Sequence, residues 1–161
     1  MIDRLAYGRE LASLLGEAAA YARSFLGNRP DAEDAVQQAA LQAWHRIEQY
    51  DTTRPFKGWW FAILRNCCFD LLRQRRTATT RGIDGIDPPD TRATEVFDWE
   101  RLDAGLRNLS PAHQEILRLR YYGGLSYEAL AETLGIPKGT VMSRLHLARK
   151  ALAEQLRSEA R

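Results

Sequence analysis

The chain has 161 residues, enough for one ordinary domain or two small ones. It is 45% hydrophobic and 27% charged, a composition typical of soluble globular proteins. The uncharged stretches near its N-terminus are too short to span a bilayer, and no basic segment followed by an apolar one marks a secretory signal. The adjacent cysteines Cys67 and Cys68 cannot close a loop within the fold or supply metal-ligand spacing. We therefore expect a cytoplasmic protein with no membrane insertion, no cofactor and no metal.

Charge is distributed unevenly along the chain. The net charge is only +2, which by itself does not indicate a nucleic-acid-binding protein. Residues 1–76 and 99–161 are both mildly basic, whereas residues 77–98 are acidic and contain two glycines and two adjacent prolines. The sequence therefore predicts two small domains, 1–76 and 99–161, joined by a flexible acidic linker over 77–98.

Residues 1–76 have the apolar periodicity of helices, and no segment alternates with the period of two that marks a strand. One helix is predicted within about 6–27, ending at Gly27. A second is predicted over 31–49, with Asp31 as its N-cap. Its expected buried face consists of Val36, Ala40, Trp44 and Ile47. A third begins at Pro55, and its apolar stripe consists of Phe56, Trp60, Ile63, Cys67 and Leu71.

Residues 99–161 contain four predicted helices separated by caps and glycines. A short helix over 99–107 is followed by a second that Ser110 caps and that ends before Gly123. Ser126 caps a short third helix, Gly135 ends it, and Pro137 starts the last helix. The apolar side of the last helix is expected to consist of Val141, Leu145, Ala148 and Leu152. The predicted fold is all-α, with a helical bundle before the linker and further helices after it.

The helices on either side of Gly135 have the organisation of a helix-turn-helix. Ala131 and Gly135 supply the small residues needed where the two helices cross, and the second helix is basic. In such a unit the start of the second helix presents donors to base edges and phosphates, a task that suits Lys138 and Arg144. The alternative is a helical hairpin whose charges are merely solvated. Agreement among capping, spacing and basicity favours DNA binding.

Two parts of the chain resemble the extracytoplasmic-function (ECF) sigma factors. The segment from Leu106-Arg-Asn-Leu-Ser-Pro through Gly139-Thr-Val-Met-Ser-Arg-Leu resembles their region 4. Upstream, Asp31-Ala-Glu-Asp-Ala-Val-Gln-Gln is similar to region 2.2, and Phe56-Lys-Gly-Trp-Trp-Phe-Ala-Ile-Leu-Arg-Asn is similar to regions 2.3–2.4. Region 4 alone is weak support, because many regulators share this helix-turn-helix, but both regions in order are typical of the family. The resemblance implies an alternative sigma factor that binds core RNA polymerase and directs initiation at promoters.

The resemblance also implies the partners of the protein. Region 2.2 of the family docks on the clamp coiled coil of the polymerase β′ subunit, and Asp34 and Gln37 match its docking positions. Gln38 stands where an acid is normal in the family, and Asp31 begins the same surface, although capping alone would also explain the acids. The other implied partners are the polymerase β flap, promoter DNA, and an anti-sigma factor or other regulator.

In the family, regions 2.3–2.4 melt the −10 element and hold a base flipped out of the stack. This task needs a loop pocket, aromatic rings and cations along a single strand. The loop over 50–54 suits the pocket, and Trp60 lies on the apolar stripe, which leaves Trp59 as the candidate for DNA contact. The predicted −10 residues are Tyr50, Asp51, Thr52, Arg54, Lys57, Trp59, Arg65, Asn66 and Arg73.

Region 4 of the family reads the −35 element with its recognition helix. Ser143 and Arg144 match the family pattern, whereas Met142 and Leu147 stand where some relatives have basic residues. Fewer cations shift the expected recognition toward DNA shape and apolar contacts. The predicted −35 residues are Tyr127, Glu128, Lys138, Thr140, Met142, Ser143, Arg144, His146 and Arg149.

Catalysis finds no support in the sequence, so we expect that the protein is not an enzyme. His45, His113 and His146 are scattered, and no glycine-rich phosphate loop or nucleophile elbow is present. Two other classes of protein stay open. One is a sigma-mimicking adaptor that binds an anti-sigma factor without contacting promoters. The other is a stand-alone helix-turn-helix regulator that acts as a dimer on a palindromic site.

Overall fold

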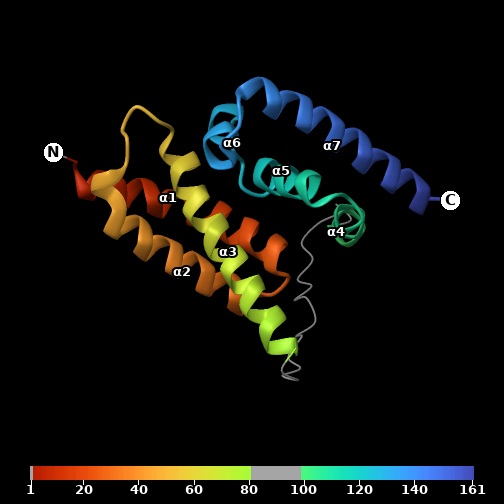
Figure 1. Ribbon diagram of the computed structural model, residues 1–161, viewed down its shortest axis with the longest axis horizontal. Coiled ribbons are helices and arrows are strands. Elements are labelled where there is room, and N and C mark those ends of the chain that lie inside the picture. Colours follow the sequence, from red (N-terminus) through yellow and green to blue (C-terminus); the bar gives the residue numbers. More distant parts are fainter. Residues whose placement is uncertain (1, 81–98) are drawn as a thin grey trace.

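The computed structural model describes residues 2–80 and 99–161, and within these two ranges every regular element is a helix. The prediction of an all-α fold is therefore confirmed. The N-terminal unit comprises α1 (Arg4–Leu26), α2 (Arg29–Arg46), the 3₁₀ helix η1 (Ile47–Gln49) and α3 (Phe56–Thr80). The C-terminal unit comprises α4 (Trp99–Arg107), α5 (Pro111–Tyr121), α6 (Tyr127–Leu134) and α7 (Lys138–Glu159). Figure 1 shows both units, with α3 running from the C-terminal unit down through the N-terminal one.

Local capping signals set most helix ends. Gly27, with φ of 81°, ends α1 in the left-handed conformation, and Gly135, with φ of 64°, ends α6 in the same way. The side chains of Ser110 and Ser126 accept hydrogen bonds from the backbone N–H groups of His113 and Ala129, as the sequence predicts. α3 continues through residues 77–80, which the sequence places in the linker, and residues 81–98 of that linker lie outside the described residues.

The start of α2 differs from the prediction that Asp31 is its N-cap. Asn28 is the N-cap, and its side-chain oxygen accepts a hydrogen bond of 2.9 Å from the backbone N–H of Asp31. Pro30 is tolerated in the first turn because its missing N–H would have no partner there. The Asp31 carboxylate is thereby released from capping and accepts hydrogen bonds from Arg75 of α3.

The buried face of α2 also differs from the predicted one. Its buried residues are the four alanines 32, 35, 39 and 43, followed by Ile47. These small side chains let α1 and α3 lie close to α2, which packs against both. Trp44, predicted to be buried, is 43% exposed, and the Arg4 guanidinium lies over its ring at 5.4 Å. The prediction was wrong for Trp44 because helical periodicity does not separate a core tryptophan from an amphipathic surface one.

The apolar stripe predicted for α3 is confirmed over most of its length. Phe56, Trp60, Ile63 and Cys67 are buried, and Leu71 is half-buried. A second set that the stripe does not include is also fully buried, namely Phe61, Leu64 and Cys68. A helix that is buried on two faces needs a neighbour on each. In the N-terminal unit α1 and α2 supply one cover, and the C-terminal unit supplies the other.

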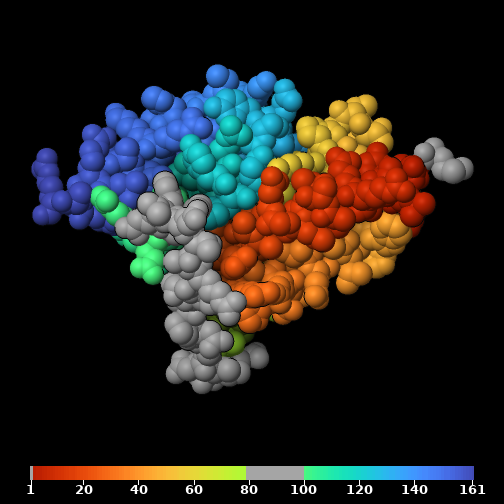
Figure 2. All heavy atoms as spheres, turned by 180° about the vertical axis from the view of Figure 1, so that it is seen from behind, coloured from red at the N-terminus to blue at the C-terminus, as the bar shows by residue number. Residues whose placement is uncertain are grey.

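The two units pack directly on each other, which the sequence does not predict. α6 lies against α3, and α5 lies against α1 (Figures 1 and 2). At the centre of this contact a Cβ added to Gly58 would lie 2.8 Å from the carbonyl oxygen of Ala129 and 2.9 Å from Cβ of Glu132. Only a glycine at position 58 therefore permits α6 to come so close to α3.

Candidate promoter and polymerase interfaces

The start of α7 carries most of the predicted −35 residues on its outer face. Lys138, Met142, Ser143 and His146 are exposed, whereas Thr140 and Arg144 are half-buried. The side chain of Met142 is 54% exposed although it is apolar. On the inner face Val141, Leu145 and Ala148 are fully buried, as predicted. The helix thus presents a mixed polar and apolar surface that is fixed to a packed core.

The remaining −35 candidates are held by contacts within the C-terminal unit. Nζ of Lys138 lies 3.2 Å from the Glu128 carboxylate. Nε of Arg149 donates a 2.7 Å hydrogen bond to the hydroxyl of Tyr121, and hydrogen bonds with Tyr121 and Tyr127 raise the pKa of Arg149 further. Arg149 therefore ties α7 to α5. Tyr121, which is 57% exposed beside it, was missed by the sequence because it precedes the helix-turn-helix pattern.

The loop that follows η1 is rigidly built around Tyr50. The Tyr50 ring is buried and contacts the rings of Tyr7, Phe56 and Trp59, at centroid distances of 5.4, 5.5 and 5.0 Å. Its hydroxyl donates a hydrogen bond to the backbone carbonyl of Arg54. The buried Tyr50 side chain thus holds the loop in place. Trp59 is half-buried, and its ring packs on the Tyr50 ring.

The tip of the same loop is exposed and self-bonded. The Asp51 carboxylate accepts hydrogen bonds from the backbone N–H and the hydroxyl of Thr53, at 3.0 and 2.7 Å, and these bonds lower the pKa of Asp51. Thr52 and Arg54 are exposed beside it. The sequence prediction that residues 50–54 form one loop is confirmed, and its backbone conformation is set by its own side chains.

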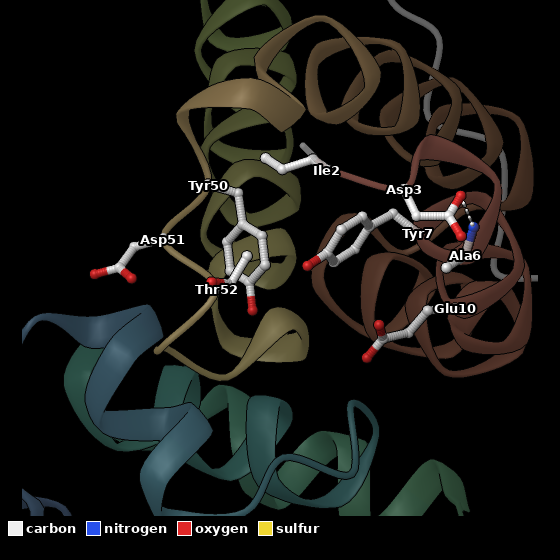
Figure 3. Close-up of a pocket in the computed structure, with 8 residues that line it drawn as sticks. All are labelled: Ile2, Asp3, Ala6, Tyr7, Glu10, Tyr50, Asp51 and Thr52. Atoms are coloured by element: carbon white, nitrogen blue, oxygen red, sulfur yellow. Dashed lines mark hydrogen bonds between the residues drawn. The ribbon is translucent and has the colours of Figure 1, made fainter.

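An open cavity of about 650 Å³ lies between this loop and the start of α1. Tyr50, Asp51 and Thr52 line it from the loop, and the α1 side is lined by Ile2, Asp3, Ala6, Tyr7 and Glu10. Figure 3 shows the Tyr7 hydroxyl directed toward the Tyr50 ring, and Asp51 directed away from α1. The α1 residues were missed because they lie before the segments that carry the resemblance, so no motif marks them.

Most of the predicted −10 cations lie on α3, and Arg54 lies in the loop before it. Asn66 and Arg73 are exposed, and Arg73 pairs with Asp70 on its own helix. Lys57 binds the carboxylate of Glu17 in α1, and its Nζ donates a 3.1 Å hydrogen bond to the carbonyl of Gly124 in the C-terminal unit. Arg65 pairs with Glu115 of α5. Nη1 of Arg54 lies 3.2 Å from the Glu132 carboxylate of α6.

The predicted docking surface on α2 is open to solvent. Asp34, Gln37 and Gln38 are exposed, and Leu41 and Trp44 continue the surface with 62% and 43% of their area exposed. Asp31 differs, because it is half-buried against Arg75. Burial alone would raise the pKa of Asp31, but hydrogen bonds from Arg75 and Asn28 outweigh it and lower the pKa. Two apolar side chains exposed next to each other on one helix indicate a contact surface.

Cys67 and Cys68 are buried, and burial with the neighbouring Cys67 raises the pKa of Cys68 to about 12, so the thiol stays protonated near neutral pH. Among residues 2–80 and 99–161, no His, Cys, Asp and Glu side chains group closely enough to hold a metal ion. No helix in the same ranges has the length and apolar character needed to cross a bilayer.

Each of the two units matches a known protein family model. The family model for sigma-70 region 2 covers residues 11–78, and the model for sigma-70 region 4 covers residues 99–152. ECF RNA polymerase sigma factor SigL of Mycobacterium tuberculosis is 37% identical over 141 residues, with 82% of this chain and 78% of SigL covered. SigW of Bacillus subtilis is 30% identical, with 82% and 79% covered.

Two solved structures are similar over nearly the whole chain. Sigma factor RpoE of Bartonella quintana, crystallised with the anti-sigma factor NepR, superposes with a TM-score of 0.74 at 29% identity, covering 94% of this chain and 97% of RpoE. CnrH, in complex with the cytosolic domain of CnrY, gives 0.73 at 29% identity, with 97% and 90% covered. Since each superposition includes both units at once, the units are arranged similarly in all three proteins.

The matches to regions 2 and 4, in that order along the chain, define a transcription regulator of the sigma-70 family. Within that family the chain belongs to the ECF RNA polymerase sigma factors. It is thus an alternative sigma factor, which binds core RNA polymerase and directs promoter-specific initiation. The match to region 2 decides against a stand-alone helix-turn-helix regulator, because such a regulator would have no use for this unit.

Proposed function

We propose that the two units recognise different elements of the promoter. The N-terminal unit, residues 1–76, docks on the polymerase and opens the −10 element, and residues 99–161 read the −35 element. The acidic residues 77–98 connect them. This proposal rests on three exposed surfaces that differ in their residue types. They lie on α2, on the 50–54 loop and on α7.

On α7 the predicted −35 contacts form one outward surface. Ser143 and His146 offer hydrogen bonds to base edges, and the exposed Met142 offers apolar contact to a thymine methyl group. Lys138, near the start of the helix, supplies charge for a phosphate, whereas Arg149 acts by holding α7 to α5. Tyr127 and Glu128, from α6, and the half-buried Thr140 and Arg144 flank this surface.

On the N-terminal unit the cavity between α1 and the 50–54 loop is proposed to hold a flipped −10 base. Tyr50 gives the cavity an aromatic wall, and Thr52 offers an exposed hydroxyl at its rim. The cations of α3, with Asn66, then follow the sugar-phosphate backbone of the separated strand. Trp59 supports Tyr50 by ring contact and is assigned a positioning role.

The α2 surface is proposed to dock on the clamp coiled coil of the β′ subunit. Leu41 and Trp44 provide an apolar centre, and Asp34, Gln37 and Gln38 provide the polar rim that interfaces of this kind have. The β flap is the proposed second contact of the polymerase, with the C-terminal unit. Because the polymerase carries out all the chemistry, the protein itself is not an enzyme, and it acts in the cytoplasm where the polymerase is.

An anti-sigma factor is the proposed regulator. The two solved structures that resemble this chain over both units are sigma factors held by NepR and by CnrY. A protein of that class would bind the same arrangement of units here. The alternative of a sigma-mimicking adaptor predicts anti-sigma binding without any initiation.

The test is run-off transcription with core RNA polymerase on sheared DNA of the source genome, with sequencing of the 5′ ends. Discrete starts preceded by shared −35 and −10 sequences are expected. Leu41→Glu should abolish these starts and core binding, whereas Leu5→Glu, on α1 with 72% of the leucine exposed, should leave both unchanged. Core binding without starts, together with tight anti-sigma binding, would favour the adaptor. Equal activity of the two variants would remove α2 as the docking surface.

A further inference from the structure

The cavity between α1 and the 50–54 loop has a negatively charged lining. The residues that line it include the acids Asp3, Glu10 and Asp51, and neither a lysine nor an arginine. Burial raises the pKa of the Tyr50 phenol in its wall, and Tyr7 with the carboxylates of Glu10 and Asp51 raises it further. Negative charges repel a phosphate group, so this lining suits the uncharged ring of a nucleotide rather than its phosphate.

Two of the three acids already have partners of their own. One carboxylate oxygen of Asp3 accepts hydrogen bonds from two backbone N–H groups in the first turn of α1, which it caps. The Asp51 carboxylate accepts hydrogen bonds from Thr53 and is directed away from α1 (Figure 3). The Glu10 carboxylate has no hydrogen bond or ion pair with any described residue, and it extends from α1 toward the loop (Figure 3). Glu10 is therefore the acid that can accept a hydrogen bond from a ligand in the cavity.

The hydroxyl groups of the cavity are less selective than this carboxylate. The Tyr50 hydroxyl donates its proton to the backbone carbonyl of Arg54, so toward a ligand it can only accept. The hydroxyls of Tyr7 and Thr52 can each donate or accept, and they suit any base edge. A carboxylate accepts and cannot donate. Any preference among the bases therefore depends mainly on Glu10.

The four bases differ in what they can offer to a carboxylate. Adenine, cytosine and guanine each carry an exocyclic amino group, whose N–H groups donate. Thymine has no amino group, and its one ring N–H lies between two carbonyl oxygens. A carbonyl oxygen that faces a carboxylate is repelled by it, and both groups are left without a donor. A flipped base is read through this same Watson–Crick edge.

We infer that Glu10 makes the cavity selective for a flipped base that bears an exocyclic amino group, and that it excludes thymine. The inference rests on the proposed function, which assigns this cavity to a base of the −10 element. Glu10 lies before residues 11–78, which the region 2 family model covers. The selectivity is thus a property of this chain that the family pattern does not specify.

The experiment measures binding of single-stranded DNA to the holoenzyme formed by this protein and core RNA polymerase. Fluorescence anisotropy is recorded with labelled oligonucleotides that carry the −10 sequence found by run-off sequencing. An abasic nucleotide is placed at each position in turn, and each of the four bases is then placed at the positions that need a base. Wild type is compared with Glu10→Gln. The matched control is Glu33→Gln, which makes the same change of charge at an exposed position of α2.

At the flipped position the wild-type holoenzyme should bind the preferred amino-bearing base about tenfold more tightly than thymine, because thymine leaves the carboxylate without a donor. Glutamine carries both an amide oxygen and an amide N–H, so it can meet either edge. Glu10→Gln should therefore bring the two affinities within about twofold, and Glu33→Gln should keep the tenfold preference. An analogue of the preferred base that lacks only the amino group should weaken binding by wild type and not by Glu10→Gln.

The abasic series separates failure of this inference from failure of the proposed function. If one position needs a base but thymine binds there as tightly as the other bases, Glu10 is not selective and the proposed base pocket stands. A tenfold preference that survives in Glu10→Gln would overturn the inference in the same way. If no abasic nucleotide weakens binding while the holoenzyme still initiates, the cavity holds no base. The proposed role of the cavity then fails, and the inference fails with it.

Discussion

The two surfaces that are proposed to contact DNA differ in their surroundings more than in their residue types. Both the start of α7 and the start of α3 carry cations beside an exposed or half-buried apolar side chain. On α7 the nearest acid, Glu128, belongs to the same unit, so the surface is complete in the isolated C-terminal unit. On α3 the acids and the carbonyl come from the other unit. One surface is therefore always presented, and the other depends on how the units are arranged.

This difference suits the order of events in initiation. Double-stranded DNA can be read by a fixed helix at any time, whereas contact with a separated strand is useful only once the polymerase has bound. Substitutions at Tyr50, Gly58, Met142 and Asp31 test this difference between the two surfaces.

The largest effect is expected for Tyr50→Ala, which removes the ring that supports the 50–54 loop. Loss of a buried aromatic side chain should lower the free energy of unfolding of the N-terminal unit by about 3–5 kcal/mol. Urea unfolding measures this loss, and Thr52→Ala, which truncates an exposed side chain of the same loop, should cost little. Binding to −35 duplex DNA should persist in Tyr50→Ala, because α7 is held by its own unit. A parallel loss of both DNA activities would contradict the separation of the two surfaces.

The next effect is expected for Gly58→Ala. The added Cβ meets the backbone of Ala129 and should destabilise the contact between α3 and α6 by about 1–3 kcal/mol, although alanine favours α3 itself. Gly16→Ala, on α1 where nothing lies within 4 Å of the added Cβ, is the matched control and should stabilise its helix without opening the chain. Small-angle scattering of the two variants measures this. Equal radii of gyration for the two variants would show that α6 shifts to make room for the added Cβ at position 58 of α3.

A smaller effect is expected on the other surface. Met142 and Leu147 are both 54% exposed on α7, but only Met142 belongs to the proposed −35 surface. Met142→Ala should weaken binding to a −35 duplex about five- to tenfold, corresponding to about 1 kcal/mol, through loss of apolar contact with the bases. Leu147→Ala should leave the affinity within twofold. Anisotropy titrations at one fixed salt concentration compare them, and a stronger effect of Leu147→Ala would move the reading surface around the helix.

The smallest effect concerns the dependence of stability on pH. The pKa of Asp31 is lower in the folded chain than its ordinary value of about 3.9. Its pairing with Arg75 therefore stabilises the fold above about pH 4 and is lost as the pH falls through the lowered pKa. Asp31→Asn should remove this contribution and flatten the acid side of the stability curve, while Asp34→Asn, on the exposed face of α2, should not. Urea unfolding between pH 3 and 7 measures both, and identical acid limbs for Asp31→Asn and the wild type would contradict the pairing.

Most of the local structure could be predicted because its signals lie within a few residues of their effect. Ser110 and Ser126 start their helices, and Gly27 and Gly135 end theirs, by hydrogen bonds and backbone angles that involve only near neighbours. The predicted N-cap of α2 was wrong because two local signals compete there. Asn28 and Asp31 are both good N-cap residues. Asn28 caps the helix in the structure, and this leaves the Asp31 carboxylate available to Arg75 of α3.

The candidate site likewise contains residues that could be predicted and residues that only tertiary packing brings together. The residues expected on the outer face of α7 and on the polar edge of α2 follow from the helix-turn-helix pattern and from the resemblance to the family, and the structure exposes most of them. The aromatic support of Tyr50 by Tyr7 could not be predicted, because α1 and the loop are joined only by tertiary packing. Trp44 was predicted to be buried because an apolar residue at helical spacing indicates burial unless its neighbours in space are known, and Leu41 lies on no surface that the sequence predicted.

The amino-acid sequence was enough to predict the all-α class, the order of the helices, most of their caps, the acidic segment between two basic blocks, and the resemblance that leads to the sigma-70 family. These properties depend on residue type, on spacing along one helix and on motifs that are contiguous in the chain. It took the three-dimensional structure to show that α6 packs on α3, that Arg65 pairs with Glu115 and that the Tyr21 hydroxyl is fully buried. Such contacts join residues 50 or more positions apart, and their formation depends on the complementary shape and charge of two whole surfaces, which no local pattern encodes.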